Sequence, residues 1–486
     1  MTNKLDRGAV WGQRSLLGPA ALAIAIALPL VAPAHGESLR QALRSAYKTN
    51  PQIEAERANL RATDENVPRA LSNYRPRVTA SADVGYQQTN TRPDTAGEGS
   101  TNPRGYSLQL QQNIFRGFRT SSAVSEAEAN IRAGRATLHS TEQTVLLAAV
   151  TAYMNVVRDQ AIVRLRENNV RVLTTNLKAT KDRFAVGEVT RTDVAQSEAS
   201  RAGAVSALDL ARANLKTSRA NYERVVGAPA SRLVEPREPG VLLPKGLADA
   251  RRLAERESPS VVAALYLEQA ARFSVNQIAG ELLPTVSMNA QYTNRYDSSR
   301  ITKQNEVGSI VGTLTVPLYQ GGEVSARVRQ AKHLHVRRIQ LIQQARTEAR
   351  EESIAAWSLL QASRAQIRSD LSLVSANQIA LNGVREEEKV GQRTLLDVLN
   401  AEQALLNSQV QLFTTKRDLV VNAYRVVAST GRLTAQDLKL HSKIYDAEVH
   451  YNEIRRRWWG ISITHRDGRH EAVDLWDSHG HGRSYK

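Results

Sequence analysis

The chain has 486 residues, only 5% of them aromatic, and carries a formal net charge of +17 at pH 7. The low aromatic content argues against a single large aromatic core, and the lack of cysteine excludes disulfides, thiolate nucleophiles and thiolate metal sites. Lys and Arg are scattered beside Glu and Asp, with no basic block interleaved with aromatics. The positive charge therefore indicates solvated helical faces, and we expect no nucleic-acid partner.

The N-terminal residues have the pattern of a secretory signal peptide. Three basic residues precede an apolar run over 16–31, and Ala32-Pro33-Ala34 then gives the small-x-small pattern of a cleavage site. The run is shorter than the ~20 residues that a membrane-spanning helix needs. We therefore expect 1–34 to be a signal peptide and the mature chain to be exported.

The two halves of the chain repeat one another. Asn50-Pro51 in the first half corresponds to Ser258-Pro259 in the second, and every matched feature from Phe115 to Gly227 recurs at one constant offset, ending at Gly431. Four prolines separate the halves, which is typical of an extended linker. The predicted divisions are a first repeat at 38–228, a proline-rich linker at 229–246, a second repeat at 247–433 and a partly disordered C-terminal extension at 434–486.

Each half also contains the pattern of a long helical hairpin. Apolar residues recur every seven positions from Val156 to Phe184, and the pattern repeats in the second half from Leu360. No proline interrupts the first long segment of either half, so each can form a helix of about 100 Å. The predicted helices are 119–184, 192–226, 323–388 and 396–429. A heptad stripe by itself indicates a coiled-coil seam and names no function.

Four shorter segments alternate between apolar and polar residues and predict strands, at about 77–87, 105–114, 285–293 and 308–316. A half-buried sheet in a soluble protein gives the same alternation. The strand lengths, however, suit a tilted strand that crosses a membrane, with Tyr86, Tyr106 and Tyr292 near the ends like an aromatic girdle. Because a membrane barrel needs at least about eight strands, four membrane strands per chain predict an oligomer.

The segments between paired helices are similar in the two halves. They read Val186-Gly187-Glu188-Val189-Thr190-Arg191-Thr192-Asp193-Val194 and Val390-Gly391-Gln392-Arg393-Thr394-Leu395-Leu396-Asp397-Val398. With the signal peptide and the strand pair before each helical hairpin, the chain over about 38–433 resembles the TolC family of outer-membrane efflux and type I secretion channels. The resemblance implies a mainly α fold with a membrane β-barrel, in which a homotrimer forms a twelve-stranded barrel continuing into a twelve-helix α-barrel.

The resemblance also implies a place in an export machine. The channel would lie in outer-membrane lipid of a Gram-negative bacterium, with its tunnel in the periplasm. A periplasmic adaptor and an inner-membrane ABC or proton-driven pump would dock at the helix tips, at Val186, Gly187, Val390 and Gly391. The duct would pass exported proteins or small toxic compounds, and it would need no catalytic residue, cofactor or metal.

By the same resemblance, Arg393 is the gate arginine, linked to Thr192 and Asp193. Asp397 and Asn400 lie at the channel constriction. Two positions depart from the family pattern, since Glu388 replaces a gate tyrosine and Asn400 replaces a second ring aspartate. The structural alternative for the tip residues is a polar turn in which Thr192 or Asp193 caps the returning helix.

Two rival functions have sequence features of their own. A periplasmic adaptor also combines a signal peptide, a helical hairpin and β-structure, but it would carry one hairpin, whereas here the whole unit repeats. A secreted enzyme or metal-binding protein is indicated only by histidines in the tail, namely His465, His470, His479 and His481. His333 and His335 lie two apart on a predicted helix and so do not face together. Residues 445–459 either pack on the tunnel exterior as an amphipathic segment or are mobile.

Overall fold

The computed structural model describes residues 37–90, 99–231, 233–236, 238–440 and 444–463, all within one compact unit, Glu37–Lys486. The predicted signal peptide and the tail histidines lie outside these residues. None of the described helices is both long and apolar enough to cross a membrane.

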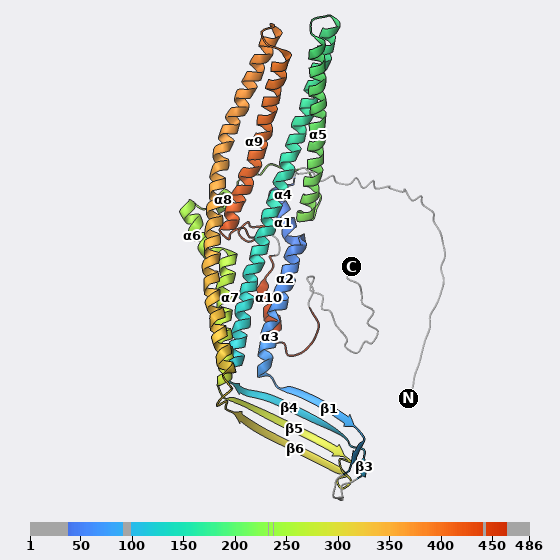
Figure 1. Cartoon of the computed structure of the whole chain (residues 1–486), viewed down its shortest axis with the longest axis vertical. Coiled ribbons are helices and arrows are strands. Elements are labelled where there is room, and N and C mark those ends of the chain that lie inside the picture. Colours follow the sequence, from blue (N-terminus) through green and yellow to red (C-terminus); the bar gives the residue numbers. More distant parts are fainter. Residues whose placement is uncertain (1–36, 91–98, 232, 237, 441–443, 464–486) are drawn as a thin grey trace, which may run out of the picture. The chain divides into compact units, whose positions relative to one another are not determined.

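The two halves have parallel lists of elements (Figure 1). The first half contains α1 (Leu39–Thr49), α2 (Pro51–Asp64), α3 (Asn66–Leu71), η1 (Ser72–Tyr74), β1 (Arg77–Val84), β2 (Gln87–Thr89), β3 (Gly99–Thr101), β4 (Arg104–Arg116), α4 (Arg119–Ala185) and α5 (Arg191–Val226). The second half contains η2 (Gly240–Leu242), α6 (Leu247–Glu257), α7 (Pro259–Ala279), η3 (Gly280–Leu282), β5 (Thr285–Tyr296), β6 (Gln304–Thr315), α8 (Glu323–Lys389) and α9 (Leu395–Ser429), followed by α10 (Ala447–Arg455).

The long helices pair within each half, α4 with α5 and α8 with α9 (Figure 1). Small apolar clusters join the partners, for example Val163 of α4 with Leu208 of α5, and Leu381 of α8 with Leu405 of α9. The chain reverses at Gly187 and Gly391, whose φ angles of 77° and 79° lie in the left-handed region where a side chain would be strained. Glycine at these two positions therefore sets where each hairpin turns.

The largest core lies where α1 packs between α4 and the C-terminal ends of α5 and α9. Inside it the Tyr153 hydroxyl lies 2.7 Å from the Glu37 carbonyl and 2.6 Å from the Val234 carbonyl, and it accepts the Val234 N–H at 3.0 Å. The Tyr222 hydroxyl donates to the Glu37 carboxylate at 2.7 Å. Burial raises the pKa of Tyr153 to about 12. These tyrosines clamp the start of the described chain and the interrepeat linker onto α4 and α5.

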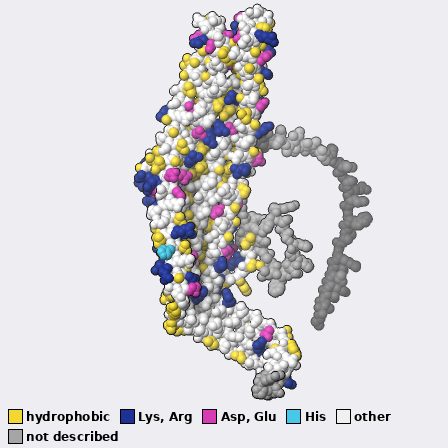
Figure 2. Space-filling view, in the orientation of Figure 1, with side chains coloured by type: hydrophobic (Ala, Val, Ile, Leu, Met, Phe, Trp, Pro, Cys, Tyr) yellow, Lys and Arg dark blue, Asp and Glu magenta, His cyan; other side chains and the backbone are white. Residues whose placement is uncertain are grey.

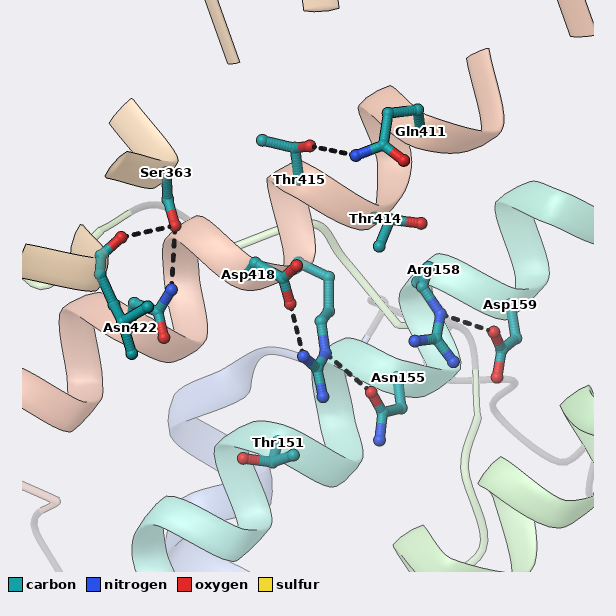
Figure 3. Close-up of polar contacts among 12 residues, drawn as sticks. Thr151, Asn155, Arg158, Asp159, Ser363, Gln411, Thr414, Thr415, Asp418 and Asn422 are labelled. Carbon is teal, nitrogen blue, oxygen red and sulfur yellow. Dashed lines mark hydrogen bonds and ion pairs between the residues drawn. The ribbon is translucent and has the colours of Figure 1, made fainter. Parts of the chain in front are cut away.

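Polar pairs with one buried member lie at matching positions of the two hairpins. In the first half the Ser218 hydroxyl donates to the buried Asp159 at 2.5 Å. In the second half the Asn422 amide donates to the buried Ser363 at 2.9 Å (Figure 3). Between the halves, Arg417 of α9 donates to Asn155 of α4 at 2.9 Å. A buried polar group stays satisfied only while its partner is opposite, so these pairs fix the register of the helices.

The sheet has the order β1-β4-β5-β6 with all neighbours antiparallel, so β4 and β5 join the two halves. β1 ends at Val84, short of the predicted end near 87, and the chain continues into a separate two-stranded sheet of β2 and β3. Pro103 lies opposite Gly85 at this point. Because proline has no N–H to donate, the ladder stops there.

Replacing Tyr153 with Phe should lower the free energy of unfolding by about 1–3 kcal/mol, because the Val234 N–H and two carbonyls lose the hydroxyl of a fully buried side chain as their partner. Thermal unfolding followed by circular dichroism in detergent measures this change. Tyr319→Phe is the control, since Tyr319 is largely exposed and its loss of a hydroxyl should leave the midpoint unchanged. Equal midpoints for both variants would show that the clamp contributes nothing.

Candidate functional site

The four-stranded sheet has one mainly apolar and one mainly polar face, the latter also carrying Val307 and Val311. The pairing registers place on the apolar face Val78, Ala80, Leu108, Leu110, Ala290, Tyr292, Ile310 and Leu314. They place on the polar face Thr79, Ser81, Ser107, Gln109, Gln291, Thr293, Ser309 and Thr313. Figure 2 shows charged side chains spread over the helices and near the loop end of the sheet, with a mostly uncharged stretch between.

Neither face of the sheet is covered by the described chain. Every residue of β1 and β6 is exposed, including Ile310 at 77% and Leu314 at 65%. On the polar face Ser81 and Ser107 share a hydrogen bond of 2.8 Å, and Arg295 donates to Asp83 at 2.6 Å. An apolar face of this extent is costly in water and marks a surface that meets lipid or protein.

The sheet also has two unpaired edges. Within the described residues β1 pairs only with β4, and β6 only with β5. Each edge presents a row of backbone N–H and C=O groups that a further strand can pair. Inside a bilayer such an edge would leave those groups without any partner, so a membrane sheet must close.

At the helix tips, the helices α5 and α9 begin with the same capping box. The Thr190 hydroxyl accepts the Asp193 N–H at 3.2 Å, and the Asp193 carboxylate accepts the Thr190 N–H at 2.8 Å. Thr394 and Asp397 make the same contacts, at 3.3 and 3.0 Å. Hydrogen bonds from the cap threonine lower the pKa of both aspartates. Both carboxylates therefore act as helix caps in a single chain.

The capping box corrects one sequence expectation. We expected Thr192 or Asp193 to cap the returning helix, whereas the N-cap is Thr190 and Asp193 is the third residue of the box. Thr192 is exposed. The helix therefore begins one residue earlier than the predicted 192, because Thr190 supplies the hydroxyl for the cap.

Arg393 pairs differently within one chain than the resemblance implied. Its Nε donates to Glu387 at 2.9 Å, six residues back across the turn, and no contact with Thr192 or Asp193 is present among the described residues. The Glu387 carboxylate raises the pKa of Arg393.

Glu388, where the resemblance implied a departure from a gate tyrosine, joins the two hairpins. Its carboxylate accepts from Arg183 of α4 at 2.8 Å, and Arg183 also lies 3.0 Å from Glu188. The hydrogen bond with Glu388, and secondly that with Glu188, raises the pKa of Arg183. An ion pair thus connects α4 to α8 near the tips. Since Arg183 is 41% exposed, solvent screens the pair.

A buried carboxylate near the tips was missed by the sequence reasoning. Glu402 is only 7% exposed, and it accepts from Arg385 at 2.7 Å and from Asn176 at 3.2 Å. The internal repeat could have revealed it, because Arg385 and Glu402 correspond to Lys181 and Glu198 of the first half. Those two residues also form an ion pair, at 2.6 Å. Asn400, the expected constriction residue, is exposed on the same helix.

The tip contacts surround a polar cavity of about 590 Å³ between the hairpins. Its lining includes Asn176, Arg183, Arg385, Glu388 and Glu402. At the turns themselves, Val186 and Val390 are exposed at 78% and 69%. Two exposed apolar side chains at the ends of charged hairpins form a surface suited to contact with another protein.

A metal site in the described part of the chain would need histidine and acidic side chains close together. No group of three or more His, Asp or Glu there is arranged to hold a metal ion. His335 pairs with Glu268 at 2.5 Å between α8 and α7.

Replacing Thr190 with Ala should make the amides at the start of α5 exchange with solvent about fivefold faster, a typical effect of losing an N-cap. Hydrogen–deuterium exchange with mass spectrometry measures it, with Thr192→Ala as the matched control that leaves exchange unchanged. The lowered pKa of Asp193 means that the cap is at full strength above the ordinary carboxyl pKa and weakens as pH falls through the lowered value. If the Thr192 variant exchanged faster instead, Thr192 and not Thr190 would be the N-cap.

Comparison with known proteins was made for both sequence and fold. The family described as outer membrane efflux protein matches residues 42–228 and 250–432, one match in each half. The outer membrane efflux protein BepC of Brucella suis is 38% identical over 89% of this chain and 93% of its own length. The outer membrane protein TolC of Escherichia coli K12 is 26% identical over 83% of this chain and 84% of its own.

The fold is similar to that of the Campylobacter jejuni CmeC outer membrane channel, with a TM-score of 0.74 and 17% identity, over 86% of this chain and 89% of that one. These matches confirm the predicted resemblance to TolC and the mainly α fold with duplicated hairpins. They exclude the periplasmic adaptor and place the protein in the outer membrane of a Gram-negative bacterium, with a tunnel in the periplasm. With both halves matched, the chain belongs to the outer membrane efflux protein family.

Proposed function

We propose that three copies of this chain form the exit duct of a tripartite export machine. The observation that carries the proposal is the four-stranded sheet, which has one apolar face, one polar face and two unpaired edges. Pairing β1 of one copy with β6 of the next satisfies both edges. The apolar face then meets lipid and the polar face lines water, as in membrane barrels.

The strand count and the family together support three chains. Two copies would reach the smallest known barrels, of about eight strands, and three copies give a twelve-stranded barrel. In the same trimer α4, α5, α8 and α9 of each copy supply a twelve-helix α-barrel. A cyclic arrangement uses the same heterologous edge contact three times and leaves no free edge.

The helix tips are the proposed gate. In the trimer Arg393 exchanges its bond with Glu387 for Thr192 and Asp193 of a neighbouring copy, which links the copies. The ion pair of Arg183 and Glu388 takes the place of the family tyrosine by holding the two hairpins of one copy together. Asp397 and Asn400 lie at the constriction, where a ring of Asp397 carboxylates favours cations.

The exposed tips of the helical hairpins support the proposed adaptor and pump as partners. Val186, Gly187, Val390 and Gly391 are the proposed contact points for a periplasmic adaptor, which recruits an ABC or proton-driven pump of the inner membrane. The pump supplies the energy, and the duct passes small toxic compounds or exported proteins without catalysis of its own. The exposed valines at both turns support this contact, because they have no partner among the described residues of one chain.

Purified protein reconstituted in planar bilayers should give small, cation-preferring currents, and Arg393→Ser should raise the conductance severalfold because a link between copies is lost. Arg337→Ser, an exposed arginine of α8 far along the sequence from the tip, is the matched control and should leave the conductance unchanged. Wild-type protein that gives no current and runs as a monomer in detergent would overturn the proposed duct. Unchanged current in the Arg393 variant would remove only this residue from the gate.

Glu388→Gln should raise the open fraction in the same assay by up to about fivefold, since a partly exposed ion pair contributes less than about 1 kcal/mol. Arg183→Gln should have a similar effect. The double variant should add nothing beyond Arg183→Gln, because that change already removes the pair with Glu388 as well as the contact with Glu188. Additive effects in this double-mutant cycle would show that the two residues act separately.

A further inference from the structure

The chain after the second repeat returns along the first-half helices. We refer to residues 444–463 as the C-terminal strap. Its helix α10 packs on α2 and α3 (Figure 1). Of the two alternatives for this segment, packed or mobile, the structure therefore has the packed one. His450 Nδ1 lies 3.0 Å from the fully buried Asp64, and the Tyr451 hydroxyl donates to Glu128 of α4 at 3.2 Å. Arg135 of α4 holds Glu448 at 3.1 Å.

The end of the strap is fixed beside the start of the sheet. The Arg75 guanidinium donates to the Arg457 carbonyl at 2.6 Å and lies 4.9 Å from the centre of the Trp458 ring. Arg75 precedes β1 by two residues. Neighbouring contacts tie the same place to β4, since Arg116 donates to Asn73 at 2.6 Å. Trp458 is therefore held where the helices end and the sheet begins.

A closed turn presents the apolar residues of the strap to the outside. The Arg457 guanidinium donates to the Ser462 carbonyl at 3.1 Å and to its hydroxyl at 2.6 Å. Gly460, with a φ of 109°, allows the chain to reverse between them. On this turn Trp458 is 68% and Trp459 is 89% exposed.

Isoleucines and arginines complete this surface. Ile461 and Ile463 are about half exposed, and Arg455 and Arg456 precede the turn. Arg455 pairs with Glu128 at 3.3 Å, whereas Arg456 is exposed. Tryptophan is enriched at membrane–water interfaces because its ring is apolar and its N–H is polar. Arginine binds phosphate groups through paired N–H donors. Two tryptophans, two isoleucines and adjacent arginines at the base of a membrane sheet match a phospholipid headgroup layer.

We propose that the turn at 457–463 binds the phospholipid surface at the periplasmic side of the outer membrane. The strap then anchors the outside of the channel where the barrel meets the α-barrel, with the tryptophans at headgroup level and Arg456 on a phosphate. This inference rests on the proposed function, because it needs the sheet to lie in the membrane. It adds a lipid contact made by a segment outside both repeats.

Tryptophan fluorescence in vesicles of brominated phosphatidylethanolamine and phosphatidylglycerol tests the proposal with the full mature chain. In the variant Trp357→Phe/Trp476→Phe, the emission comes from Trp458 and Trp459. Bromine near the headgroups should quench most of it, and bromine deep in the acyl chains should quench less. Emission that shifts to the blue but is not quenched would mean that another protein surface covers the turn, which overturns the proposal.

Two matched variants separate the possible failures. A chain that keeps only Trp357, which packs beside Leu360 on α8, should not be quenched. In a chain without other tryptophans, Leu108→Trp reports on the apolar face of the sheet and should be quenched by both lipids. If Leu108→Trp is quenched and the strap is not, the strap proposal fails alone. If neither is quenched, the proposed membrane function fails as well.

Discussion

The open backbone edges of the four-stranded sheet are the constraint on which the rest of this protein depends. A sheet with an apolar face can lie in a bilayer only when every edge N–H and C=O has a partner, and one chain leaves two edges without partners. Closure by identical copies is the economical solution, since the same edge contact is repeated around an axis. The helices would be arranged around the same symmetry axis as the sheet, because only a short segment separates β4 from α4 and β6 from α8.

Duplication accounts for much of the architecture, and the two halves differ in their side-chain contacts near the tips. The hairpins share capping boxes, turn glycines and polar pairs with one buried member, which are features any such hairpin needs. The hairpins differ in the contacts of two glutamates near the tip of the second one. Glu388 binds Arg183 across the hairpins, while its counterpart in the first half is Phe184, an exposed aromatic residue. Glu402 is buried and bonded to Asn176 of the other hairpin, whereas Glu198 pairs within its own hairpin.

The tyrosine clamp and the C-terminal strap act at opposite ends of α1 to α3. The clamp ties Glu37 and Val234 to Tyr153 within the largest core, and the strap ties Arg75 to Trp458 at the start of the sheet. Both use segments outside the repeated hairpins. Contacts of this kind stiffen the places where helices change partners, while the tips have exposed turns and ion pairs that solvent screens.

Local patterns in the sequence determined the secondary structure and the class of the protein. Heptads without proline predicted α4 and α8, and apolar–polar alternation predicted the strands, because both patterns belong to neighbouring residues. The internal repeat predicted that the same order of elements occurs twice. Which side chains meet was decided only by the tertiary structure. Thr190 rather than Thr192 caps α5, Glu388 reaches Arg183, and Trp458 stacks on Arg75, since each contact needs a distance that packing alone supplies.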